Sequence, residues 1–216
     1  MTFRKFLVVG ALAASLALSA CSPGTPAPKP APPTPAPSAT ESPTPTASSQ
    51  LTVNVDGVTF AHAGRSETVP FTDTTGLLAL VSDAVGTSPA VSKVEDLPGY
   101  SFNLTAYDWT GLKVVSNGIN ASISATSARV GGVTIQTGQG VAVGSTRVDL
   151  LALQPTEIAD ENSDGIPDDF GVEPQEEPGT NSLRHPGSLG ITYILVIMDG
   201  DAVKQIQSPA NDFSDI

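Results

Sequence analysis

Apolar and polar residues alternate from Leu51 to Phe60 on both sides of the pair Asp56-Gly57. Alternation with a period of two predicts strands with one buried face, and Asp-Gly between two such runs predicts a tight turn. The same alternation predicts further strands over residues 100–106, 112–115, 119–125, 133–135, 191–198 and 202–206. The last two strands are expected to form a hairpin that turns at Asp199-Gly200-Asp201.

Two segments have a helical period instead. From Thr74 to Val85 the apolar residues recur at intervals of three and four, which predicts a helix with one buried face. Asp73 or Thr74 is suited to cap its start, and Gly86 and Pro89 are suited to end it. A second helix is expected to open at Gly144-Ser145-Thr146 and to stop at Pro155, with these apolar residues on it: Val148, Leu150, Leu151 and Leu153.

The order of these elements suggests an internal repeat. Leu-Leu-Ala-Leu occurs at residues 77–80 and again at 150–153, and the segment 108–115 aligns with 199–206. A helix followed by a hairpin, twice over, predicts an α+β fold in which two short helices pack on antiparallel sheet. The chain from residue 51 to 216 is therefore expected to be one domain with half-repeats 51–130 and 131–216. The longer spacing in the second half predicts an acidic insertion over 157–177.

That acidic tract holds the one chemical motif of the chain. It contains nine acidic residues and no basic residue. Oxygen-bearing side chains stand at positions 1, 3, 5 and 9 of a loop with glycine at position 6, a spacing that wraps oxygen ligands around one calcium ion. The candidate ligands are Asp160, Asn162, Asp164, Ile166 through its carbonyl group, Asp168 and Asp169.

The tract resembles the Asp-x-Asp-x-Asp-Gly loops of EF-hand, dockerin and thrombospondin-type repeats. It departs from them at position 12, where Gly171 stands in place of a bidentate glutamate and leaves that role to Asp169 or Glu173. Two interpretations stay open at this point. One is a calcium site that orders the insertion, and the other is a solvated acidic loop without a bound ion.

The N-terminal segment predicts where the protein works. Arg4 and Lys5 precede an apolar run over residues 6–18 that is too short to span a bilayer and has the length of a signal-peptide core. The following residues, Leu18-Ser19-Ala20-Cys21, resemble the lipobox of bacterial lipoproteins. The resemblance implies a signal peptide over 1–20, cleavage before Cys21, lipidation of its thiol and attachment to the extracytoplasmic face of the cell membrane.

Residues 21–50 are expected to be a disordered linker. Ten prolines lie between Ser22 and Gln50, and alanine, threonine and serine fill most of the remaining positions. Such a segment cannot bury enough apolar surface to offset the entropy lost on ordering. In an extended polyproline conformation it would reach roughly 90 Å from the membrane.

Two further resemblances are weaker. The segment from Gly144 to Pro155 is similar to the helix-opening motif of small outer-membrane-assembly lipoproteins and tandem-repeat β-lactamase inhibitor proteins. That similarity covers about a dozen residues, and the analogy with the inhibitor proteins implies an inhibitor or regulator of an extracytoplasmic enzyme. The whole chain also resembles uncharacterised lipoproteins of actinobacteria, which implies a location and no activity.

The net charge and the motifs that the sequence lacks reduce the number of possible function classes. The formal net charge of −12 disfavours binding to nucleic acid or to anionic lipid headgroups. The sequence has no Gly-x-Ser-x-Gly elbow, no zinc-ligand spacing and no nucleotide-binding glycine loop. We therefore expect a non-enzymatic binding or scaffolding module that contacts the membrane through Cys21 and a cell-wall component or envelope protein through its domain.

Alternatives to this expectation are an inhibitor or regulator of an extracytoplasmic enzyme and, less favoured by the motifs, an envelope hydrolase that uses Ser or Asp with His185. Tyr107 and Trp109, beside a predicted turn, are expected either to form a binding surface or to cover the edge of the core. The oligomeric state does not follow from the sequence.

Overall fold

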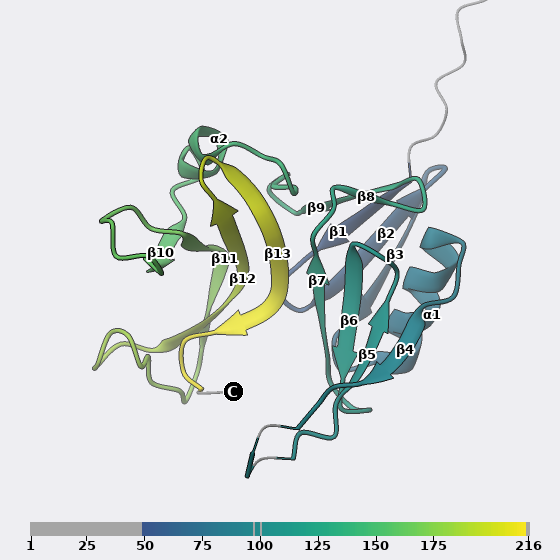
Figure 1. Cartoon of the computed structure of the whole chain (residues 1–216), viewed down its shortest axis with the longest axis horizontal. Coiled ribbons are helices and arrows are strands. Elements are labelled where there is room, and N and C mark those ends of the chain that lie inside the picture. Colours follow the sequence, from purple (N-terminus) through teal and green to yellow (C-terminus); the bar gives the residue numbers. More distant parts are fainter. Residues whose placement is uncertain (1–48, 97, 100, 215–216) are drawn as a thin grey trace, which may run out of the picture. The chain divides into compact units, whose positions relative to one another are not determined.

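The computed structural model describes residues 49–214 apart from residues 97 and 100. Of this part of the chain, 46% lies in strands and 10% in helices. The strands form a five-stranded sheet and an eight-stranded sheet, and the helices are short (Figure 1). The architecture resembles a β-sandwich, so the predicted α+β fold built from helix–hairpin repeats is wrong.

The five-stranded sheet has the strand order β3-β2-β1-β9-β8. Strands β1 (Gln50–Val53) and β2 (Gly57–His62) pair antiparallel, which confirms the hairpin predicted around Asp56-Gly57. Strand β3 (Arg65–Pro70) extends this hairpin on its outer side. On the other side, β9 (Val133–Thr137) pairs with β1 in parallel, and β8 (Arg129–Val130) pairs with β9.

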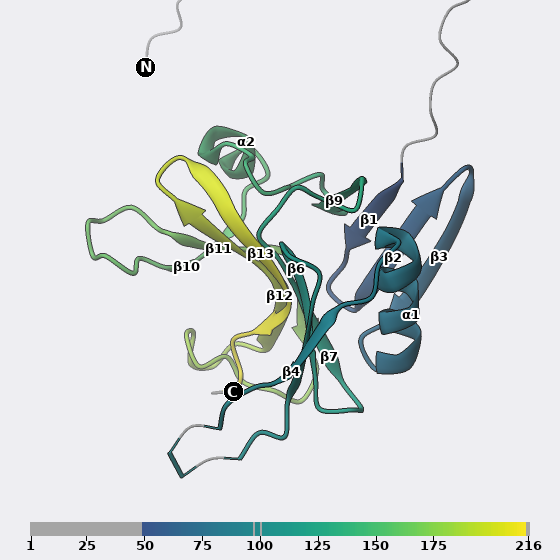
Figure 2. The ribbon, with the colours of Figure 1, turned by 45° about the vertical axis from the view of Figure 1, so that its right-hand side comes forward.

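Helix α1 (Thr74–Val85) has the predicted bounds. The Asp73 side chain accepts a hydrogen bond from the Gly76 amide at 2.9 Å, and Gly86 ends the helix in the left-handed conformation. Figures 1 and 2 show α1 alongside β2 and β3. Its buried side chains include Leu77 and Val81, and they belong to a hydrophobic cluster shared with the five-stranded sheet and with β6 and β7.

The eight-stranded sheet has the order β10-β11-β12-β13-β7-β6-β5-β4. Its members are β10 (Thr156–Ala159), β11 (Asp169–Glu177), β12 (Gly190–Asp199), β13 (Ala202–Asn211), β7 (Ala121–Ala125), β6 (Leu112–Ser116), β5 (Thr105–Asp108) and β4 (Ala90–Lys93). All its pairings are antiparallel. The hairpin predicted at Asp199-Gly200-Asp201 is confirmed by β12 and β13.

A second hydrophobic cluster lies between β11, β12, β13 and helix α2 (Arg147–Leu151). The Thr146 side chain caps α2, in agreement with the predicted start, but the helix has only five residues. Leu150 is its one buried apolar residue, whereas Val148 is 78% exposed. The two clusters adjoin at the β1–β2 turn, where the Ser208 hydroxyl donates a hydrogen bond to the Asn54 carbonyl at 2.7 Å.

The predicted half-repeats are incompatible with this topology. The proposed boundary after residue 130 falls inside the β8–β9 hairpin, where Val130 pairs with Val133. Strand β9 then returns to the sheet of the first half by pairing with β1. The two helices also differ in length and burial. The described residues therefore form a β-sandwich-like fold and not two tandem helix–hairpin repeats.

Several strands were missed or displaced in the sequence-based prediction. Residues 101–104 were expected in a strand, but β5 begins only at Thr105, and Tyr100 lies outside the described residues. The acidic tract 157–177 was expected to be an insertion, yet it supplies most of β10 and all of β11, which pairs with β12. Over the residues described, no helix is long and apolar enough to cross a membrane.

Candidate functional site

The candidate calcium loop connects β10 to β11, and its acidic side chains bind its own backbone. The Asp160 carboxylate accepts hydrogen bonds from the amides of Gly165 at 2.8 Å and Asp164 at 3.2 Å. Asn162 Oδ1 accepts a second bond from the Asp164 amide, and Asp164 Oδ1 accepts one from Ile166. These contacts close three successive polar turns, so the spacing that predicted metal ligands also folds the loop locally.

An arginine from outside the acidic tract enters this loop. Arg147, the first residue of α2, donates hydrogen bonds to the Pro167 carbonyl at 2.6 Å and to the Gly200 carbonyl at 2.7 Å. Its side chain is only 14% exposed. Arg147 lines a polar hollow of about 190 Å³ together with Asn162, Asp164, Ile166, Asp168, Gly200 and Asp201. The sequence missed Arg147 as part of this site because it precedes the tract.

The six predicted ligands are not all brought together. Asn162, Asp164, Ile166 and Asp168 line the hollow with Arg147. The Arg147 guanidinium lies over the ring of Phe170 in β11. Because successive side chains of a strand point to opposite faces, the neighbouring Asp169 side chain points to the other face of β11. Within the described part of the chain, no group of three or more histidine, cysteine or acidic residues has the arrangement of a metal site.

Asp169 is in an unusual environment for a carboxylate. One of its oxygens, Oδ1, is buried and has no hydrogen-bond partner in the described residues. Burial raises the pKa of Asp169, and the negative charges of Glu161 and Asp168 raise it further. The side chain therefore favours its neutral form more strongly than an exposed aspartate does.

The hydrolase alternative required a serine or aspartate beside His185. Ser182 and Asp212 do lie near this residue, and the Ser182 hydroxyl donates to the Asp212 carboxylate at 2.5 Å. However, the contact from His185 is its backbone amide, which donates to the Ser182 hydroxyl at 2.9 Å. Asp212 also accepts a bond from the Ile191 amide. This network holds the loop before β12 and lacks the serine–imidazole bond of a nucleophilic triad.

Trp109 and Tyr107 belong to the core rather than to a binding surface. Trp109 is 6% exposed and its indole N–H donates to the Thr87 carbonyl at 2.9 Å. Tyr107 packs against the same hydrophobic cluster. Of the two interpretations given for these aromatic residues, the one in which they cover the core edge is confirmed.

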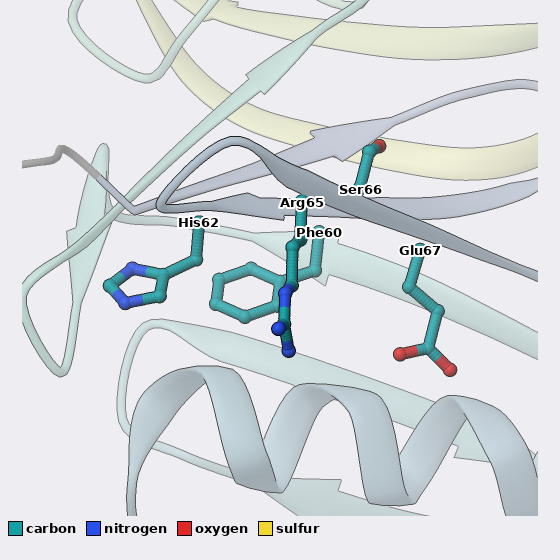
Figure 3. Close-up of a pocket in the computed structure, with 5 residues that line it drawn as sticks. All are labelled: Phe60, His62, Arg65, Ser66 and Glu67. Carbon is teal, nitrogen blue, oxygen red and sulfur yellow. The ribbon is translucent and has the colours of Figure 1, made fainter.

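A second hollow, of about 320 Å³, lies on the β2–β3 hairpin and opens toward α1 (Figure 3). It is lined by Phe60, His62, Arg65, Ser66 and Glu67. The rings of Phe60 and His62 are nearly parallel, with centroids 6.1 Å apart. The Ser49 hydroxyl and His62 Nδ1 are hydrogen-bonded at 2.7 Å, which fixes the imidazole. No motif in the sequence predicted this site, because its residues come together only when the two strands pair.

Cys21, the predicted lipidation site, lies outside the described residues. Comparison of the chain with protein-family models, with curated proteins and with solved structures found no match to any of them.

Proposed function

We propose that the protein is exported, lipidated at Cys21 and held on the extracytoplasmic face of a cell membrane, where its β-rich domain acts as a non-enzymatic binding or scaffolding module. The observation that carries the proposal is the sequence Leu18-Ser19-Ala20-Cys21 after a short apolar run. The chain has no other cysteine, so its one thiol stands where an acyl acceptor is required. Two or more acyl chains anchor a protein stably, whereas one chain binds only marginally.

The arrangement of the domain is compatible with a role in binding. Domain residues begin about thirty positions after Cys21, and the intervening proline-rich composition suits a spacer. The hollow on the β2–β3 hairpin combines an aromatic pair with charged side chains on an exposed surface. The Ser182–Asp212 contact, by contrast, has the structural role described above.

Metabolic labelling with a palmitate analogue tests the anchor. The wild-type chain should incorporate the label and sediment with membranes, whereas Cys21→Ser should stay unlabelled and leave the membrane fraction. Ser22→Ala is the matched control, because it changes a neighbouring hydroxyl residue and leaves the thiol in place. Equal labelling of wild type and Cys21→Ser would refute the proposal. A hydrolase activity of the purified domain that one substitution abolished would refute its non-enzymatic part.

We further propose that calcium orders the β10–β11 loop. Two observations support the calcium proposal. The oxygen-bearing side chains from Asp160 to Asp168 have the spacing of calcium ligands. The loop also has more acidic than basic side chains, and Arg147 is the basic residue that lines its hollow. To bind the ion, the carboxylates of Asp160 and Asp164 would have to give up their hydrogen bonds with backbone amides and coordinate calcium instead. That exchange has a cost, so we expect a weak site of the kind that extracellular calcium can fill.

A further inference from the structure

The hollow on the β2–β3 hairpin is formed by two cross-strand pairs. Phe60 lies opposite Glu67, and His62 lies opposite Arg65. Because side chains at alternate positions share a face, all four project from the side of the hairpin that carries the core residue Val58. Toward the end of the hairpin this side is accessible to solvent, because Phe60 is half-buried and His62, Arg65 and Glu67 are exposed. Figure 3 shows the Phe60, Arg65 and Glu67 side chains directed toward α1.

The floor of the hollow is aromatic and held in place. Phe60 is half-buried against the first hydrophobic cluster, which fixes its ring from below. The His62 ring lies beside it at an interplanar angle of 6° and is held by its bond to Ser49. Two nearly parallel rings held in this way present an apolar surface that needs little ordering before a flat ligand binds.

Charged groups stand at the edge of this aromatic surface. No described residue forms a hydrogen bond or an ion pair with the Arg65 guanidinium or the Glu67 carboxylate. Arg65 therefore offers a planar set of donors, and Glu67 offers two acceptor oxygens. A ligand that fills the hollow must bring an apolar face for the rings and several groups that both donate and accept hydrogen bonds.

We propose that this hollow binds a pyranose ring of an uncharged envelope glycan. A sugar ring has a face of C–H groups that packs on an aromatic ring, and its hydroxyl groups donate to carboxylates and accept from guanidinium groups. The hollow, at about 320 Å³, is at the lower end of the sizes of small-molecule sites and fits one or two rings of a longer chain. The proposal rests on the proposed function, since it names the ligand of the envelope binding module.

The charge of the protein favours an uncharged ligand over a polyanion. With a formal net charge of −12, the chain repels phosphate-rich and sulfated polymers at long range. In the hollow itself the carboxylate of Glu67 offsets the charge of Arg65, so the site has no excess positive charge to hold a polyanion. A neutral sugar does not need such an excess, and its binding should depend little on ionic strength.

The test uses the chain from residue 21 onwards with Cys21→Ser, which keeps both linker and domain. Chitotetraose and maltotetraose serve as neutral probes and a polyphosphate as the anionic probe, each followed by amide NMR shifts. We expect at least one neutral probe to shift the amides of β2 and β3 with a dissociation constant of about 1 mM. Raising the salt concentration should leave this constant nearly unchanged.

Two variants locate the site. Phe60→Leu keeps an apolar side chain on the core but removes the aromatic face, and Arg65→Gln removes the planar donors. Each should weaken binding about tenfold. Lys113→Gln, which removes an exposed cation from the other sheet, should bind as the unchanged protein does. Equal binding by all three variants would overturn the proposal.

Other outcomes also decide the question. The proposal is overturned if neither neutral probe shifts the amide signals at millimolar concentrations. It is also overturned if polyphosphate binds at the hollow and this binding is lost at high salt. These results are independent of the Cys21 labelling experiment. If the chain is lipidated and no sugar binds, the glycan proposal alone fails. If sugar binds and Cys21 carries no lipid, the anchor fails instead.

Discussion

The guanidinium carbon of Arg147 lies 5.7 Å from the centroid of the Phe170 ring, and this places the one cation of the β10–β11 loop hollow directly above the second hydrophobic cluster. Phe170 is 1% exposed and belongs to β11, whereas Arg147 begins α2. The same guanidinium donates to carbonyl groups on both sides, at Pro167 and at Gly200. One side chain thus ties α2, the acidic loop and the β12–β13 turn together.

Arg147→Met should destabilise the domain. The variant keeps apolar bulk over Phe170 but loses two charge-assisted hydrogen bonds and the cation–π contact, and we expect a loss of about 2–4 kcal/mol. The Asp201 pair adds little, because the Asp201 side chain is fully exposed. Thermal unfolding measures the effect, with a fall in Tm of roughly 5–12 °C. A fall no larger than that of Lys113→Met, which removes an exposed cation, would contradict this assignment.

Two neighbouring leucines of α2 should respond differently to the same substitution. Leu150 is fully buried in the second hydrophobic cluster, whereas Leu151 is 48% exposed. Leu150→Ala should cost about 2–5 kcal/mol, because it removes buried surface and leaves a cavity. Leu151→Ala should change the free energy of unfolding by at most about 0.5 kcal/mol. Urea unfolding of the two variants side by side gives the comparison, and equal losses would show that the burial of α2 is misassigned.

Calcium should raise the stability of the wild-type domain if the proposed site is occupied. At 1 mM calcium, a weak site with a dissociation constant of ~100 μM adds roughly 1.4 kcal/mol. Asp160→Asn/Asp164→Asn should lose this response, because it removes two charges while keeping an amide oxygen at each position as an acceptor for the loop turns. Glu176→Gln/Glu177→Gln removes the same charge from β11 outside the loop and should keep the response.

The measurement is the Tm of each protein with 1 mM calcium and with chelator. If the wild type does not shift, the acidic loop is folded by its own hydrogen bonds and by Arg147, and the calcium proposal is wrong. A shift shared by both double variants would place the ion elsewhere.

The raised pKa of Asp169 predicts a pH dependence with a definite sign. A carboxyl group whose pKa is higher in the folded state contributes stability that is present below its unfolded pKa of about 3.8 and is lost as the pH rises through the folded value. Asp169→Asn mimics the neutral form. It should therefore be more stable than the wild type at neutral pH, and the difference should vanish in acid.

Urea unfolding over a range of pH tests this expectation, with the exposed Asp83→Asn of α1 as the control that should show no such trend. An Asp169→Asn variant less stable than the wild type at pH 7 would mean that the ionised carboxylate is stabilised by a contact absent from the described structure, such as a bound cation.

Local sequence signals determined the elements that fold by short-range rules. The helix 74–85 follows from its apolar spacing, its Asp73 cap and the glycine after it. The hairpins at Asp56-Gly57 and at Asp199-Gly200-Asp201 follow from alternation and turn chemistry. Each of these elements has most of its defining contacts within a dozen residues, so the sequence around it contains the necessary information.

The tertiary structure decided which strands become neighbours. Strand β9 pairs with β1 across about eighty residues, a choice that no local pattern encodes. The sequence did not predict strand β11, because acidic residues flank its short apolar segment. The segment forms a strand by pairing with β12. The second helix was predicted too long, because repeated leucines were taken for a buried face when only Leu150 meets the core.

The candidate sites divide in the same way. The ligand spacing of the acidic loop is visible in the sequence, since its polar turns are local. Helix docking sets the position of Arg147 in that loop. Strand register sets the cross-strand pairs of the hairpin hollow, which are Phe60 with Glu67 and His62 with Arg65. Sequence alone determined the candidate lipidation residue and the short-range elements, whereas long-range packing alone determined the sheet order and the surfaces on which the chain presents its charged and aromatic groups.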